Sequence, residues 1–149
     1  KMETNVPFLS LKDIDVLQPN LFEAAVAALY DKQGFEIYLT SFYNNKGVNI
    51  VALKSNENFL IQVKQTNLNV AFEDIKELFS AKTYYENKFK TPFNLLLVTN
   101  SNFSNSLLSL ESSKKVNLIN RSQLDILITS NKLLIPDINR IETQRLTNI

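Results

Sequence analysis

The sequence predicts an α/β domain in which helices flank a mixed central sheet, with the element order αβββαβαβα. Three observations predict this fold. Two runs of β-branched, aromatic and aliphatic residues, 48–54 and 59–65, are separated by a polar turn, as in a hairpin. The stretch 70–89 repeats apolar residues with the period of a helix, and 93–99 is a largely apolar run typical of a buried strand. A hairpin followed by β-α-β crossovers implies a mixed sheet with helices on its faces.

The first predicted helix begins at Pro19, because proline is favoured in the first turn of a helix. Asn20 and Glu23 have the spacing of a capping box, which is a structural role for Glu23. Gly34 follows the last apolar position and suits the end of this helix. Three strands are then expected, over 35–41, 48–54 and 59–65.

The sequence of the second half of the chain predicts alternating helices and strands. Thr91 and Pro92 end the long helix, because proline removes a backbone donor and restricts the residue before it. Capping residues and short apolar runs then predict a helix over 104–112, a strand over 116–119 and a helix over 121–129.

The chain of 149 residues is long enough for one domain with its own core. We expect a leading arm over 1–18, a folded domain over 19–130, and a C-terminal tail over 131–149 that forms a short helix or a linker to a further domain. The arm is expected to pack through Val6, Phe8, Leu9 and Leu11.

The composition excludes several kinds of chemistry. The sequence has no Cys and no His, which rules out disulfides, thiolate and imidazole metal ligands, and a histidine base. Any catalysis therefore depends on carboxylates, amides, hydroxyls and lysine. With 16 basic and 15 acidic residues, the net charge of +1 argues neither for nor against nucleic acid.

Polar residues interrupt the predicted hairpin at one place. If its loop is Ser55 to Asn58, Val51 lies opposite Gln62 and Asn49 lies opposite Lys64. Because side chains alternate along a strand, Asn49, Gln62 and Lys64 then share one face of the sheet. Taken alone, Lys64 reads as a strand-end lysine that extends to solvent. The shared face favours a functional site.

These residues, in this order, give the chain a family resemblance. Phe22-Glu23 on the first helix, Gly47-Val48-Asn49-Ile50 on the second strand and Gln62-Val63-Lys64-Gln65 on the third resemble the Mrr-like branch of the PD-(D/E)xK nucleases. The similarity covers roughly Pro19 to Thr129 and extends to the run that begins at Leu97. The resemblance implies a restriction endonuclease-like fold, with the nuclease domain over 19–130.

The resemblance also implies a metal-dependent active site. Glu23 matches the family's helix carboxylate, Gln62 the first position of its QxK variant, and Lys64 its lysine. The implied cofactor is Mg²⁺, with Mn²⁺ as an alternative, held by Glu23, residue 49 and Gln62, while Lys64 positions water for phosphodiester hydrolysis. The implied activity is that of an endodeoxyribonuclease in restriction or defence against foreign DNA.

Asn49 departs from the family, which has an aspartate at this position. An amide in place of the carboxylate removes one negative charge next to a divalent ion, which costs several kcal/mol. We therefore expect this chain to be an impaired or inactive variant. The sequence leaves open whether the amide is an engineered change or natural decay, although the retained Glu23, Gln62 and Lys64 favour recent loss of one group.

Two further functions stay open at this stage. The first is a non-catalytic DNA-binding or oligomerisation module with the same fold, and the second is a nuclease resembling Holliday junction resolvases. The expected partners are DNA, a second copy of the chain in a homodimer or larger assembly, and further domains of a longer protein. The absence of a long apolar run argues against a membrane partner and for a cytoplasmic location.

Overall fold

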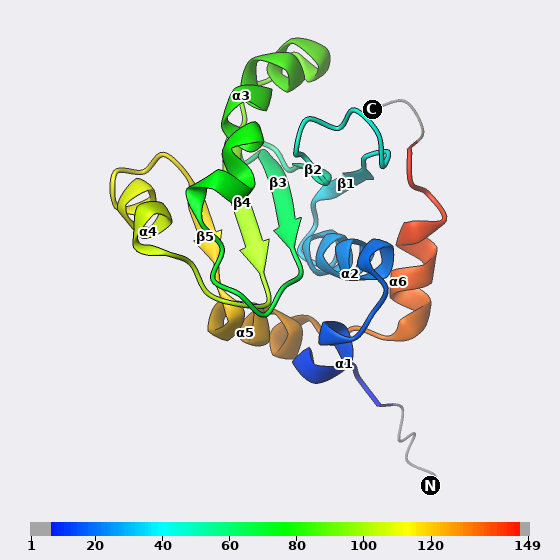
Figure 1. The fold of residues 1–149 in the computed structure, drawn as a ribbon. Helices are drawn as coiled ribbons and strands as arrows, with labels where there is room; N and C mark the ends of the chain where they lie inside the picture. The colour runs from blue at the N-terminus through cyan, green and yellow to red at the C-terminus, as the bar shows by residue number, and fades with distance from the viewer. Residues whose placement is uncertain (1–6, 147–149) are drawn as a thin grey trace, which may run out of the picture.

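The computed structural model describes residues 7–146 and contains one five-stranded sheet (Figure 1). Its strands are β1 (Glu36–Leu39), β2 (Ile50–Leu53), β3 (Phe59–Lys64), β4 (Asn94–Thr99) and β5 (Asn117–Ile119). They lie in the order β1-β2-β3-β4-β5. The first two pairings are antiparallel, and the last two are parallel. The predicted mixed sheet is therefore confirmed.

Helices cover both faces of this sheet. They are α1 (Leu11–Asp15), α2 (Pro19–Asp31), α3 (Phe72–Phe89), α4 (Asn105–Ser112), α5 (Arg121–Asn131) and α6 (Ile135–Glu142). From α2 to α5 the element order is αβββαβαβα, as the sequence predicts. The α/β fold is confirmed, and the observed ends of the elements differ from the predicted ones by a few residues.

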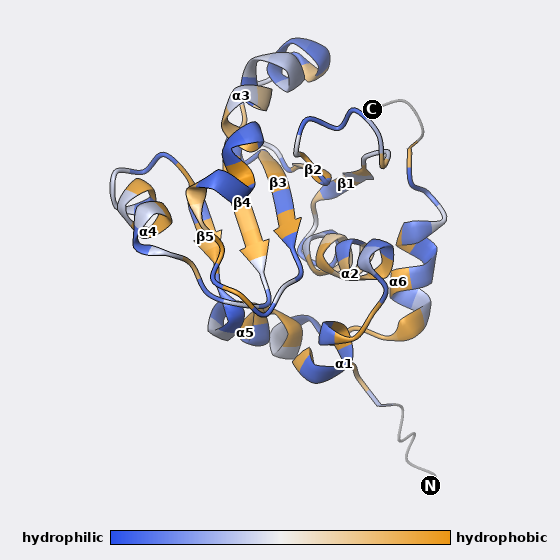
Figure 2. Cartoon of the chain, viewed as in Figure 1, coloured by the Kyte–Doolittle hydropathy of each residue, from blue (hydrophilic) through white to orange (hydrophobic). Residues whose placement is uncertain are grey.

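Alternation along the strands divides the apolar side chains between two cores. Ile61 and Val63 of β3 pack with α1, α2, α5 and α6, whereas Leu60 packs on the other face with α3 and α4. β4 divides in the same way, with Leu96 on one face and Leu97 on the other. Figure 2 shows that β4 is mostly hydrophobic, while hydrophobic and hydrophilic residues alternate along the helices. Gln62 and Lys64 follow Leu60 and lie on the face of α3.

The two ends of the described chain contribute to the core. Leu11 and Ile14 of α1 are buried, and so are Ile138 and Ile141 of α6, which packs against α2. Residues 135–142 therefore form the short helix that was one of the two expectations for the C-terminal segment. Val6, expected to pack, lies outside the described residues, and Phe8 is half exposed. None of the helices within residues 7–146 combines the length and apolar character needed to cross a bilayer.

The predicted capping box at the start of α2 is wrong. The helix begins at Pro19 with Gln18 as its N-cap, and no side chain caps it. Because the fixed φ of proline suits the first helical position, Asn20 falls inside the helix, where its side chain cannot cap. The Glu23 side chain bonds to Arg145 instead.

The predicted register of the hairpin is also wrong, by two residues. Val51 pairs with Leu60 and not with Gln62, so Asn49 comes opposite Gln62 and not opposite Lys64. The turn sits earlier than expected because the Glu57 backbone N–H donates to Lys54 O at 2.7 Å and closes a tight turn. The Asn58 side chain also accepts a hydrogen bond from the Lys54 N–H at 3.1 Å. A shift of two residues leaves every side chain on its original face, so the side chains of Asn49, Gln62 and Lys64 still share one.

Candidate functional site at the carboxyl end of β3

The candidate site lies where β3 ends beside the start of β2. The Asn49 backbone N–H donates to Ile61 O at 2.8 Å, so the ladder continues one residue beyond β2 and brings Asn49 next to Gln62. Lys64 is the last residue of β3. The fold therefore brings the amides of Asn49 and Gln62 and the ammonium of Lys64 together at the end of β3.

The Asn49 side chain is already used within the protein. Its Oδ1 accepts a hydrogen bond from the Val63 backbone N–H at 2.7 Å. This bond extends the pairing of the two strands to the residue before the start of β2. The oxygen that the family resemblance assigns to a metal therefore has a structural role here.

The side-chain oxygen of Gln62 differs from that of Asn49 in its hydrogen bonding. The Gln62 side chain is 7% exposed, and within residues 7–146 its buried Oε1 accepts no hydrogen bond. An unpaired buried polar atom costs roughly 1–3 kcal/mol unless water or a ligand satisfies it. Within residues 7–146 the Gln62 oxygen thus has no protein partner, in contrast to that of Asn49.

Lys64 carries a positive charge at the site. It is half-buried, and no ion pair in the described part of the chain involves its ammonium. It lines a groove of about 270 Å³ together with Thr66, Asn69 and Asp74. Asp74 uses one carboxylate oxygen to cap α3 through the Ala71 N–H.

Glu23 is held by a buried arginine. The Arg145 side chain is 8% exposed and donates to Glu23 Oε1 at 3.0 Å and to Glu142 Oε1 at 2.8 Å. It also donates to the backbone carbonyls of Thr40 and Asn20. Burial raises the pKa of the Glu23 carboxyl, and Arg145 acts in the opposite direction. One guanidinium is therefore shared by two carboxylates, and it only partly offsets the charge of Glu23.

A chain of hydrogen bonds connects Arg145 to Asn49. Arg145 binds the carbonyl oxygen of Thr40, which is the residue after β1. The Thr40 N–H in turn donates to Asn49 O at 3.0 Å, and its hydroxyl donates to Val48 O at 2.6 Å. The fold thus links Glu23 to the start of β2, although its carboxylate is engaged by Arg145.

These residues do not fit a divalent cation as they stand. Mg²⁺ prefers several oxygen ligands, usually with carboxylates among them. Glu23 is paired with Arg145, Asn49 is neutral and bonded to Val63, and Gln62 offers one neutral oxygen. Among residues 7–146, no cluster of three or more Asp, Glu, His and Cys side chains is placed to hold a metal ion.

The sequence reasoning missed the role of Arg145. The C-terminal segment has a polar sequence without a clear apolar face, so nothing marks this arginine as buried. It becomes buried because α6 packs on α2 and the following residues run beside β1, where the Leu146 N–H donates to Leu39 O. The bond between Arg145 and Glu23 joins residues that are 122 positions apart.

Comparisons with known proteins agree with this architecture. A family model described as restriction endonuclease, Mrr_cat, matches residues 14–128. The fold resembles the crystal structure of AF1548, a protein of unknown function, with a TM-score of 0.58 and 15% identity. It also resembles the MspJI restriction endonuclease, solved with a 27-mer oligonucleotide, with a TM-score of 0.55 and 16% identity.

The coverage of these comparisons is unequal. The alignments cover 74% and 89% of this chain, but only 65% of AF1548 and 33% of MspJI. At these identities the likeness concerns the fold. No curated protein sequence matches this chain.

Proposed function

The chain belongs to the restriction endonuclease family whose model matches residues 14–128, and from this we propose that it is a DNA-binding domain whose phosphodiester hydrolysis is impaired. The proposal depends on the two positions, 23 and 49, where the family resemblance implies carboxylates that bind a metal. Residue 49 is an amide bonded to Val63, and the Glu23 carboxylate is paired with Arg145. Both positions are thus occupied by the protein's own groups, and this arrangement supports binding without cleavage.

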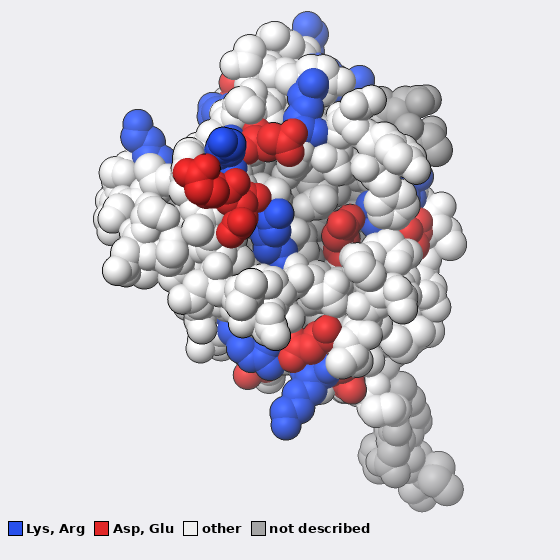
Figure 3. Space-filling view, viewed as in Figure 1, with Lys and Arg blue, Asp and Glu red and all other residues white. Residues whose placement is uncertain are grey.

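The support for DNA as the partner comes from the family and from Lys64. The Lys64 ammonium forms no ion pair within residues 7–146, and its place in a groove suits contact with a phosphate. The similar MspJI structure contains an oligonucleotide. Figure 3 shows acidic and basic side chains interspersed on this face, with no continuous basic patch. We therefore expect modest affinity with a shallow dependence on salt, because few phosphates are neutralised.

A second candidate function is cleavage by the same domain once residue 49 is a carboxylate. The unpaired Oε1 of Gln62 favours this candidate, because a buried acceptor without a partner suits a site that once held a ligand. In that case the amide of Asn49 is the main defect, and Lys64 remains able to orient water and to stabilise developing negative charge.

The test combines binding and cleavage. Fluorescence anisotropy with a labelled DNA duplex at low salt should show binding that weakens in Lys64→Gln. It should not weaken in Lys88→Gln, which removes the same charge from the other end of α3. Plasmid incubated with Mg²⁺ or Mn²⁺ should stay intact. Absence of binding, or cleavage by the unaltered chain that Lys64→Gln abolishes, would overturn the proposal.

The Asn49→Asp variant separates the two candidates. Metal-dependent cleavage that disappears in Asn49→Asp combined with Lys64→Gln would establish the second candidate. If Asn49→Asp binds DNA and leaves the plasmid intact, the site lacks more than one charge, as the pairing of Glu23 with Arg145 leads us to expect.

A further inference from the structure

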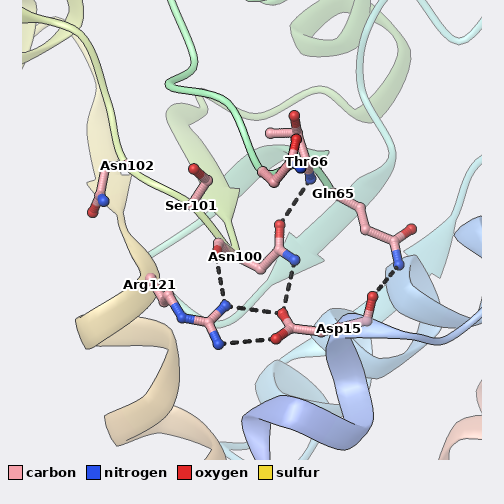
Figure 4. Close-up of a pocket in the computed structure, with 8 residues that line it drawn as sticks. Asp15, Gln65, Thr66, Asn100, Ser101, Asn102 and Arg121 are labelled. Carbon is pink, nitrogen blue, oxygen red and sulfur yellow. Dashed lines mark hydrogen bonds and ion pairs between the residues drawn. The ribbon is translucent and has the colours of Figure 1, made fainter.

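A second, larger pocket lies at the carboxyl ends of β3 and β4 (Figure 4). It has a volume of about 620 Å³, within the range of ~300–1,000 Å³ that is usual for ligand sites. Residues 65–67 follow β3 and residues 100–102 follow β4, and Asp15 and Arg121 complete the wall. In open α/β sheets, ligands commonly bind at this end of the parallel strands. Every residue that lines the pocket is polar.

The charges of this pocket cancel each other. Arg121 forms a bidentate pair with Asp15 at 2.9 and 3.0 Å, and the Asn100 amide donates to Asp15 Oδ1 at 2.8 Å. The hydrogen bonds from Arg121 lower the pKa of the Asp15 carboxyl, so the pair stays ionised. Because Asp15 and Arg121 neutralise each other, the wall of the pocket has no net charge and does not attract a phosphate. It suits a neutral ligand with both donors and acceptors.

Hydrogen bonds hold the backbone of the pocket, while three of its side chains form none within residues 7–146. The Thr66 N–H donates to Asn100 Oδ1 at 2.9 Å, and the Arg121 N–H donates to Ser101 O at 2.8 Å. In the described structure, the side chains of Asn67, Ser101 and Asn102 take part in no hydrogen bond, and Figure 4 draws no contact from the last two. Ser101 is nevertheless only 8% exposed.

The pocket adjoins the groove of Lys64. Thr66 lines both, and only Gln65 separates it from Lys64 in the chain. A DNA strand whose phosphate contacts Lys64 would therefore have the neighbouring base within reach of this pocket. A role for this pocket in DNA binding therefore rests on the proposed contact between Lys64 and DNA.

We infer that the pocket reads the edge of a nucleobase in the bound DNA, through the amides of Asn67 and Asn102 and the hydroxyl of Ser101. A primary amide offers a donor and an acceptor side by side, which is the arrangement that asparagine uses to read adenine. The network of Asp15, Arg121 and Asn100 positions the two loops and does not contact the base.

Selection from a duplex pool with a randomised core tests this inference. The unaltered chain should enrich one base at a position near the Lys64 contact. Asn102→Ala and Asn67→Ala should each reduce that discrimination roughly tenfold, with little change in affinity for the unselected pool. Asn56→Ala, an exposed asparagine in the hairpin turn at the other end of β3, is the control and should retain the preference.

The possible outcomes are distinguishable. Binding without any base preference, or a preference that survives both Asn102→Ala and Asn67→Ala, overturns the inference and leaves the proposed function standing. Absence of binding to the pool overturns both. Because Asn67 and Asn102 are exposed, unchanged melting temperatures should show that the variants are folded.

Discussion

The pairing of Arg145 with Glu23 makes a quantitative prediction about stability. Arg145→Met keeps an apolar stem against the Phe42 ring, over which the guanidinium lies at 4.2 Å, but removes the charge. Removing one partner of a buried pair costs ~3–5 kcal/mol. Glu23 keeps 19% of its side chain accessible, so we expect the low end, about 3 kcal/mol. For a chain of this length, that lowers the melting temperature by roughly 6–12 °C.

The loss should depend on pH. Burial raises the pKa of Glu23 above its ordinary value of 4.5, and Arg145 limits that rise. An acid with a raised pKa in the folded state binds more protons when folded, so its contribution to stability is lost as the pH rises. Without Arg145 the pKa rises further. The deficit of Arg145→Met should therefore be small below pH 4.5 and should reach its full size above the folded pKa.

Urea denaturation followed by circular dichroism measures this deficit. The comparison needs the unaltered chain, Arg145→Met, Glu23→Gln and the double variant, at acid and neutral pH. The double variant should recover about 2 kcal/mol relative to the sum of the single changes. The reasoning is refuted if the two changes are additive, or if the deficit of Arg145→Met is the same at both pH values.

Three further predictions follow from single residues. Gln62→Met should raise the free energy of unfolding by about 1 kcal/mol, because it removes the unpaired Oε1; a decrease in chemical denaturation would show that water or a ligand satisfies this atom. Gly47→Ala should cost at least 1 kcal/mol, because the residue has φ +80 and an added Cβ would lie 3.0 Å from a side chain of α3. Gly34→Ala, with φ +96 and its nearest neighbour at 3.8 Å, is the control and should cost less in the same denaturation experiment. Asp15→Asn should destabilise the protein at neutral pH, because Arg121 lowers the pKa of Asp15. That difference should vanish in melts at a pH well below 3.8, where both states protonate Asp15; a constant difference would contradict the assigned pair.

The amino-acid sequence by itself determined the order of helices and strands from α2 to α5, but α1 lies within the expected leading arm and was not predicted. Apolar periods of 3.6 and 2 residues depend on local spacing, and the core faces of α3 and β3 follow from them directly. The shared face of Asn49, Gln62 and Lys64 was equally local in origin. It survived the error in the hairpin register because a shift of two residues preserves the alternation.

Only the tertiary structure decided which groups these side chains meet. Glu23 pairs with an arginine 122 positions away, and Asp15 pairs with Arg121 across 106 positions. Such contacts depend on how α6 packs on α2 and how α1 reaches the ends of β3 and β4, and no local pattern in the sequence encodes that packing. The sequence therefore specified the candidate residues, while the fold determined that Arg145 pairs with Glu23 and that a polar pocket lies beside Lys64.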